Sequence, residues 1–491
     1  MPATEFTFLT VDGHGRPLEP GSRASIRSRC MKGVNVRKDS RRSRRQARKA
    51  SETVAATESL RKATVSPEIT PPCQFTSCGP LSKSLQVRTD ELGFDSSRLP
   101  STAWRLVVKF NALLDAAYPL ETYLDNIDLQ EHNMIDNLTL LNENKTLLES
   151  MFLATYAVDD LCSGTKLSLR SQQILCTILS SLNSSLRDPS GQQSYSTIFI
   201  ILILLFAAES FRDFDAVSTH LDGLRRLLEL RETKTVPLDS KLLFKIQQVD
   251  LRMSLATGRP LYFPFDYSYP QPPAGVISPP SIIPWLMVHP ALMTCYQTLQ
   301  ALSNDTNKRQ ASRVGPLLNW TDFQSQVSTR QTHLIGLGSS QLPVESEALR
   351  LGMLAFLSTL SRSPARKSHL PIFTSQLEEC YLAMEQEQDS YMPLLIWLML
   401  MGYMSTIDTS SLISSSVWRS SVEPDLSWQA AQRTVSEFPW INMIHDEPGG
   451  RSFRHLQGSR GNISEKGRMN LPCEDMSLVC CEKDAVHVDI R

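Results

Sequence analysis

The sequence predicts an all-α fold, a large multi-helix domain with a disordered basic region before it and a tail after it. From about residue 100 onward, apolar side chains recur at helical spacings of three and four residues. Aromatic residues make up only 7% of the 491 residues while Leu and Ser are abundant, which disfavours a large β-sandwich. Before residue 100 the chain is basic at first and then rich in Ser, Thr and Pro.

Composition divides the chain into four parts. Residues 1–50 form a basic N-terminal stub. Residues 51–99 hold few large apolar groups and are predicted to be a disordered linker, because such a segment cannot offset its own ordering entropy. Residues 100–450 carry the helical pattern. Residues 451–491 come after Pro448-Gly449-Gly450, are polar without a clear period, and are expected to be a tail.

The first predicted helix begins at Ser101 or Thr102, which are suitable capping residues, and ends before Pro119. A turn is expected at Asp188-Pro189-Ser190-Gly191. The all-apolar run that follows is expected to lie centrally. The further helices of this half are predicted over 134–158, 171–182, 198–208, 214–228 and 242–256.

The clearest helical pattern lies between residues 214 and 228, where apolar residues step by three and four. Asp222 and Arg226 are expected to pair on its other side. The next helix ends at Gly258, where a left-handed residue belongs, and Pro260 blocks its continuation.

After this point the pattern is less regular. Residues 261–282, rich in proline and aromatics, predict a long crossing or an exposed loop, and 304–340 are ambiguous. Later helices are predicted over 284–303, 344–362, 373–386, 391–407 and 428–440.

Neither a membrane segment nor a secretory signal is expected. The longest apolar run, Ile198–Ala208, has 11 residues, whereas a bilayer span needs about 20. Met1–Thr10 lacks a basic region followed by an apolar stretch. Ten scattered cysteines are far below the density of a disulfide scaffold. These observations favour a reducing compartment, the cytoplasm or the nucleus.

No closed metal or phosphate site is predicted. The cysteines at 73 and 78, and at 473, 480 and 481, lack the companion pairs that a zinc cluster needs, and we expect inert thiols. Gly336-Leu337-Gly338 lacks the third glycine and the preceding strand of a phosphate loop. His220 flanks an apolar stripe and is expected to be a partly buried, hydrogen-bonded imidazole. We therefore predict no catalytic, cofactor-binding or metal-binding residues.

Asp159-Asp160 supports an alternative hypothesis. Paired carboxylates on a helix can hold magnesium and a diphosphate, which would make the chain an α-helical magnesium-dependent enzyme. A third aspartate would then follow three residues after the second, and that position is Ser163. The favoured interpretation is a solvated pair at a helix end before Gly164.

A basic block is the unusual feature of the chain. Residues 23–49 hold 12 Lys or Arg and one acid, Asp39. Such a block suits nuclear import, contact with nucleic-acid phosphates, or solubility alone. No aromatic residue is interleaved with it, so stacking on single strands is not indicated. The candidate residues for import and DNA contact are Arg37, Lys38, Arg41, Arg42, Arg44, Arg45, Arg48 and Lys49.

Several motifs occur in a recognisable order. They are FTFLTVDG at 6–13 with IRSRCMKG at 26–33, THLDGLRRLLELR at 219–231, DLRMSLATGRP with FP at 250–264, PLLIWLMLMG at 393–402 and EFPWI at 437–441. In this order they resemble the fungal-specific transcription-factor-like proteins, whose helical regulatory domain follows a zinc cluster or a basic stub. Here the zinc binuclear cluster is absent.

The resemblance implies an all-α regulatory domain and nuclear localisation. Together with the basic block and the missing catalytic motifs, it leads us to expect a nuclear transcription regulator without enzymatic activity. Pathway-specific control would be the preferred detail if the gene lay beside a metabolic gene cluster. The expected partners are a nuclear import receptor, transcription-related proteins, and DNA through the basic block, with no membrane. Gly223 is expected to allow a close helix crossing. The oligomeric state stays open, and a non-catalytic helical scaffold in the cytoplasm is the remaining alternative.

Overall fold

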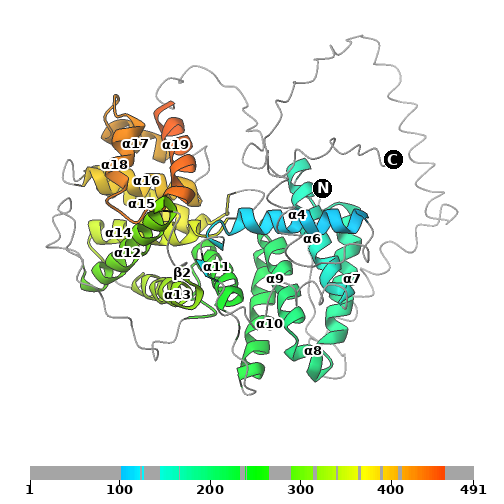
Figure 1. Cartoon of the computed structure of the whole chain (residues 1–491). Coiled ribbons are helices and arrows are strands. Elements are labelled where there is room, and N and C mark those ends of the chain that lie inside the picture. Colours follow the sequence, from blue (N-terminus) through cyan, green and yellow to red (C-terminus); the bar gives the residue numbers. More distant parts are fainter. Residues whose placement is uncertain are drawn as a thin grey trace, which may run out of the picture. The chain divides into compact units, whose positions relative to one another are not determined.

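The computed structural model confirms the all-α fold (Figure 1). The chain divides into two units, Met1–Gly79 and Pro80–Arg491, and every described residue belongs to the second. The predicted stub, the linker and residues 459–491 of the tail lie outside the described residues. The structure describes residues 101–121, 124–125, 144–164, 166–232, 238, 240–264, 289–312, 318–338, 341–362, 367–386, 391–406 and 412–458.

Helices make up nearly all of the described regular structure, and two-residue strands β1 (Leu124–Asp125) and β2 (Leu318–Asn319) pair in parallel. Among the described helices, none combines the length and apolar composition that a membrane crossing requires. The helices are α4 (Ser101–Ala117), α6 (Lys145–Ser163), α7 (Leu169–Ser185), α8 (Pro189–Gln193), α9 (Tyr195–Ser210), α10 (Phe214–Glu232), α11 (Ser240–Thr257), α12 (Pro290–Ser312), α13 (Trp320–Leu337), α14 (Val344–Thr359), α15 (Pro371–Gln386), α16 (Met392–Ser405), α17 (Leu412–Ser421), α18 (Trp428–Val435) and α19 (Asn442–Gly458).

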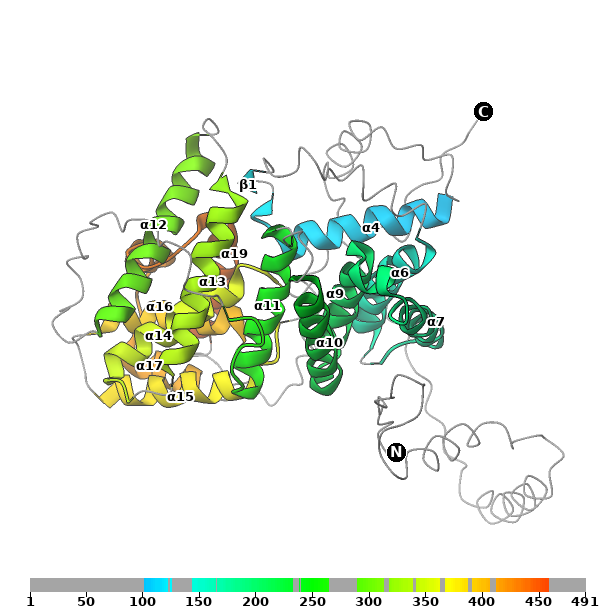
Figure 2. The same ribbon diagram turned by 90° about the horizontal axis from the view of Figure 1, so that it is seen from below.

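Two apolar clusters form the core, and α11 belongs to both. One face of α11 places Ile246 and Val249 in the cluster of α4, α6, α7, α9 and α10. Another face places Phe244 and Leu251 in the larger cluster built mainly by α12–α19. Figure 2 shows α11 between these two groups of helices. Because both faces of α11 are buried, it joins the two clusters, as does α4, whose Phe110 lies in the first cluster and Ala117 in the second.

The most apolar helices lie deepest, as their composition predicts. In α9, residues 200–205 are at most 4% exposed, which confirms that the apolar run 198–208 is central. In α16, residues 397–401 are at most 1% exposed, and this helix packs against α14. A helix that is apolar all round must be covered on every side.

The predicted end of α11 is confirmed in detail. Gly258 has a φ of 69°, in the left-handed region that a residue with a Cβ rarely adopts. Its backbone N–H donates to the carbonyl of Ser254 at 2.8 Å. The glycine thus closes the last turn and turns the chain away from the helix axis.

The predicted tail begins too early. The chain remains helical beyond residue 450, and Phe453 and Leu456 are buried in the larger cluster. The Pro-Gly-Gly sequence lies inside α19, because the glycines accommodate aromatic rings. A Cβ added at Gly449 would lie 2.7 Å from Cη2 of Trp440. The prediction that a tail begins at residue 451 was therefore wrong.

Other boundaries also differ from the sequence expectations. The helix predicted over 134–158 begins at Lys145, where the Asn144 side chain caps it by accepting the Leu147 N–H at 3.0 Å. The turn at 188–191 includes the short helix α8. The ambiguous stretch 304–340 contains the end of α12 and all of α13, and the predicted last helix stops at Val435. The short Ser-rich helix α17 was not predicted.

Gly223 does not serve the close helix crossing that the sequence suggested. No described atom lies within 4 Å of a Cβ built at this position in α10. Replacing Gly223 by Ala is therefore expected to raise the free energy of unfolding by about 0.5–1 kcal/mol, because glycine is the less favourable residue in a helix interior. Urea denaturation of the wild type and the variant measures this. A loss of stability would show that the position is packed.

Candidate functional site

A polar network lies where the chain leaves α11 and crosses α10. Asp250, buried in α11, accepts the backbone N–H of Tyr262 with Oδ1 at 3.0 Å and that of Phe263 with Oδ2 at 2.8 Å. Both carboxylate oxygens are thereby used to hold one short segment, 258–264, against the helix. This carboxylate is a structural anchor for the segment.

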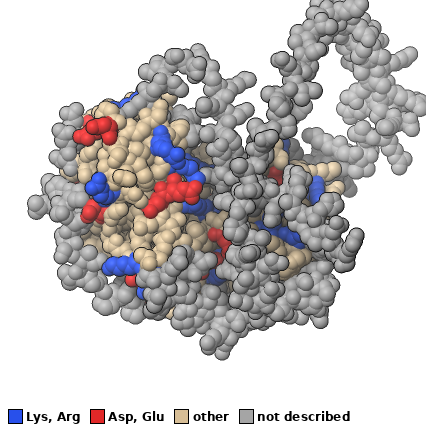
Figure 3. Space-filling view, turned by 45° about the horizontal axis from the view of Figure 1, so that its top comes forward, with Lys and Arg blue, Asp and Glu red and all other residues tan. Residues whose placement is uncertain are grey.

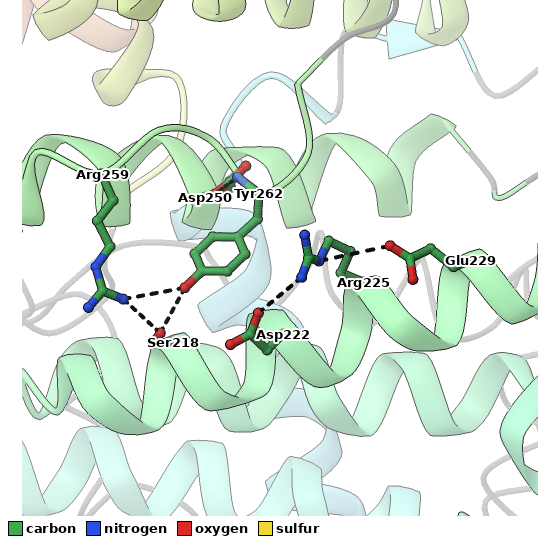
Figure 4. A network of polar contacts seen from close by, with 7 residues as sticks. All are labelled: Ser218, Asp222, Arg225, Glu229, Asp250, Arg259 and Tyr262. Atoms are coloured by element: carbon green, nitrogen blue, oxygen red, sulfur yellow. Dashed lines mark hydrogen bonds and ion pairs between the residues drawn. The ribbon is translucent and has the colours of Figure 1, made fainter.

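The same segment is held to α10 by hydroxyl groups (Figure 4). The hydroxyls of Ser218 and Tyr262 lie 2.7 Å apart, and Nη1 of Arg259 donates to Ser218 Oγ at 3.0 Å. The Ser254 hydroxyl donates to the Arg259 carbonyl at 2.5 Å. Arg259 is exposed, so the rest of its guanidinium faces solvent. The network combines a cation and two hydroxyls at the surface.

The outer face of α10 carries a chain of weaker ion pairs. Arg225 lies 3.6 Å from Asp222 and 3.9 Å from Glu229. The predicted pair between Asp222 and Arg226 is not observed, since Arg225 takes this place. All these side chains are largely solvent-exposed, so the pairs contribute little to stability.

The motifs that carry the family resemblance meet in pairs. Ser218 of α10, directly before the 219–231 motif, contacts Tyr262 and Arg259 in the segment that ends the 250–264 motif. The 393–402 and 437–441 motifs meet at Trp397, whose Nε1–H donates to the Pro439 carbonyl at 3.2 Å. The Trp397 ring stacks on Phe438 with centroids 4.9 Å apart. The described motif residues therefore build two structural contacts between distant parts of the chain.

A second, buried polar network joins the two apolar clusters. The Arg252 guanidinium of α11 donates to both carboxylate oxygens of Glu209 in α9, the Nη2–Oε2 distance being 2.9 Å. Arg252 also donates to the hydroxyl of Ser361, which donates to Gln248 Oε1 at 3.2 Å. Arg252 is 2% exposed. Sequence reasoning missed this network, because Arg252 is one of several charged and amide residues in α11 and its partners are distant in the chain.

The paired carboxylates of the alternative enzyme hypothesis are engaged in internal contacts. Asp159 forms an ion pair with Lys109 at 2.5 Å. Asp160 accepts from the backbone N–H of Ser168 at 2.8 Å and from the hydroxyl of Ser171 at 2.6 Å. Within the described ranges, no group of three His, Cys, Asp or Glu side chains is placed to hold a metal ion. The two aspartates fasten α6 to α4 and to the start of α7.

The other candidate residues are partly or fully buried, cap a helix, or lie outside the described part of the chain. His220 is partly buried, and burial lowers the pKa of its imidazole to about 4. Gly338 caps the end of α13 and approaches Arg350. Burial raises the pKa of the Cys295 thiol to about 11 and that of Cys380 to about 12, so both are protonated and unreactive near neutral pH.

The basic candidates at 37–49 and the cysteines at 73, 78, 473, 480 and 481 lie outside the described residues.

Asp250 should leave a measurable signature in the pH dependence of stability. Burial outweighs the two backbone hydrogen bonds and raises the pKa of its carboxyl from 3.8 to about 7. The native state thus holds this proton more tightly than the unfolded chain. The stability it confers is complete below pH about 4 and is lost as pH rises to about 7, a change of about 4 kcal/mol at about 1.4 kcal/mol per pKa unit.

Asp250→Asn should remove that contribution, because an amide does not ionise. The measurement is the free energy of unfolding between pH 4 and 8 for the wild type and the variant, whose difference isolates residue 250. Asp222→Asn, on the exposed side of α10, is the matched control and should leave the profile unchanged. Parallel profiles for the wild type and Asp250→Asn would contradict the prediction.

Chemically, the α10–α11 network places a surface cation beside two hydroxyl groups, all of which can donate hydrogen bonds. No protein-family model, no curated protein and no solved structure matches this chain.

Proposed function

We propose that this chain is a nuclear transcription regulator that catalyses no reaction of its own. The basic block at 23–49 directs import and contacts DNA phosphates, and the helical body binds a partner protein or a small effector. The observation that carries this proposal is the block of 12 basic residues opposed by one acid.

The distribution of charge over the rest of the chain makes this block distinctive. Outside 23–49 the chain has 38 basic and 50 acidic residues, so the near-neutral total conceals a cationic segment on an acidic protein. On the face of the described part in Figure 3, the acidic and basic side chains are interspersed among uncharged ones. A local cationic segment is what import receptors and phosphate backbones recognise.

The helical body supports the proposal through its motifs. The segments that resemble the fungal transcription-factor-like proteins lie at, or directly beside, the α10–α11 network and the Trp397 contact. At the first of these contacts, Arg259 and the hydroxyls of Ser218 and Tyr262 offer hydrogen-bond donors near the surface. Such donors suit a carboxylate or carbonyl group of an effector or partner.

Localisation tests the import role. A fluorescent fusion with Arg41, Arg42, Arg44 and Arg45 replaced by Ala should lose nuclear accumulation, because the core of the cationic block is neutralised. The matched control replaces four exposed arginines of α17–α19, which are Arg419, Arg433, Arg451 and Arg454. Nuclear accumulation that persists in the first variant would remove the import role, and a diffuse wild-type protein would favour the cytoplasmic scaffold.

Salt dependence tests the DNA role. Binding of the full chain to duplex DNA should weaken as salt rises, with a log–log slope of about −0.9 for each phosphate neutralised. The quadruple variant at 41–45 should flatten this slope, while the control at α17–α19 should retain it. A wild-type slope near zero would end the claim of phosphate contact without touching the import role.

A further inference from the structure

The buried network around Arg252 has more hydrogen-bond donors than acceptors. Arg252 donates to Glu209 and Ser361. Two hydrogen-bond donors on neighbouring side chains have no acceptor among the described residues. They are the hydroxyl of Tyr118 and the Nε2 amide of Gln248, which are 2% and 0% exposed. An unmet donor at such depth is costly and rare in native proteins.

Both donors border the same guanidinium. Ser361 accepts from Arg252 and donates to Gln248 Oε1, which places the amide group beside Arg252. The N–H of Arg362 donates to the Ala117 carbonyl at 2.8 Å, so the residues next to Ser361 and Tyr118 are in direct contact. The Tyr118 oxygen is within hydrogen-bonding reach of the Arg252 guanidinium, and the charges of Arg252 and Glu209 both act on it. Arginine only donates, so it cannot accept the Tyr118 proton.

We propose that this network is a binding site for one small hydrogen-bond acceptor, held by the Tyr118 hydroxyl, the Gln248 amide and the remaining N–H groups of Arg252. Water and chloride share the required chemistry, since each accepts several hydrogen bonds and is small enough for a protein interior. Its ligands come from the end of α4 and from α11, and Arg252 also binds α9. The occupant therefore joins the two apolar clusters at α11, which contributes to both.

Isosteric removal of the donors gives different results for an occupied and a dry site. If an acceptor is bound, Tyr118→Phe loses the hydrogen bond to it and the unfolding equilibrium constant should rise about tenfold. If nothing is bound, the variant loses only the contact of the Tyr118 oxygen with Arg252, and the loss should be clearly smaller than that of Tyr296→Phe. Tyr296→Phe calibrates the loss, because the Tyr296 hydroxyl donates to the Glu437 carbonyl at 2.5 Å.

A double-mutant cycle tests whether the two donors share one acceptor. Tyr118→Phe and Gln248→Met should be non-additive, because either change alone already weakens the binding of the common occupant. Urea denaturation of the full chain supplies all four values. Additive effects, or a loss in Tyr118→Phe clearly smaller than that in Tyr296→Phe, would overturn the proposal.

Chloride titration then distinguishes the two occupants. At constant ionic strength, with gluconate replacing chloride, bound chloride would raise the unfolding midpoint of the wild type but not of Tyr118→Phe. A midpoint independent of chloride, together with a non-additive cycle, would identify the occupant as water.

Discussion

Replacing Glu209 by Leu is expected to lower the free energy of unfolding by about 4 kcal/mol, because it leaves the Arg252 guanidinium buried without its counter-charge. Arg252 is 2% exposed and spends two donor groups on this carboxylate. The attraction between the two charges only offsets the free-energy cost of taking both out of water. Removing Glu209 therefore leaves the desolvation cost of Arg252 without any compensating attraction. Urea denaturation at neutral pH measures the loss.

Two further variants test whether the buried charge, and not a change in packing, causes the loss of stability. Glu447→Ala breaks an exposed pair with Arg451 at 2.9 Å and should change stability by less than about 1 kcal/mol. The double variant Glu209→Leu with Arg252→Met should regain most of what Glu209→Leu loses, since no buried charge remains. A Glu209→Leu variant as stable as Glu447→Ala would refute the assignment.

Replacing Gly352 by Ala is expected to cost about 3 kcal/mol, at the upper end for overpacking of a core. A Cβ at this position in α14 would come closer than 3.0 Å to three ring carbons of Trp397 in α16. The indole cannot retreat easily, because it stacks on Phe438 and donates to the Pro439 carbonyl. The loss is measured by thermal or urea denaturation.

The controls for this variant are within the same chain. Gly223→Ala places the same methyl group in open space on α10 and is expected to stabilise. In the Gly352→Ala background, Trp397→Phe removes the ring carbons that clash and should recover part of the stability. Equal effects of alanine at 352 and 223 would mean that the α14–α16 contact is not close-packed.

The sequence identified the segments that form the candidate network, but it did not show which of their residues contact one another. The 219–231 and 250–264 segments stood out as motifs, and Gly258 was correctly placed as the helix stop. The bonds from Asp250 to the Tyr262 and Phe263 backbone join residues 12 and 13 apart. The contact of Ser218 with Tyr262 spans 44 residues. Neither leaves a periodic signal in the chain.

The sequence by itself determined the helical class, the central position of residues 198–208 and the end of α11, because apolar spacing and glycine–proline chemistry act locally. Only the tertiary structure decided that Pro448-Gly449-Gly450 stays inside a helix and that Arg252 meets Glu209. These outcomes depend on which distant side chains arrive at the same place. Tryptophan rings filling the space above a glycine, and a carboxylate 43 residues away neutralising a buried cation, are favourable only once the two clusters have packed around α11.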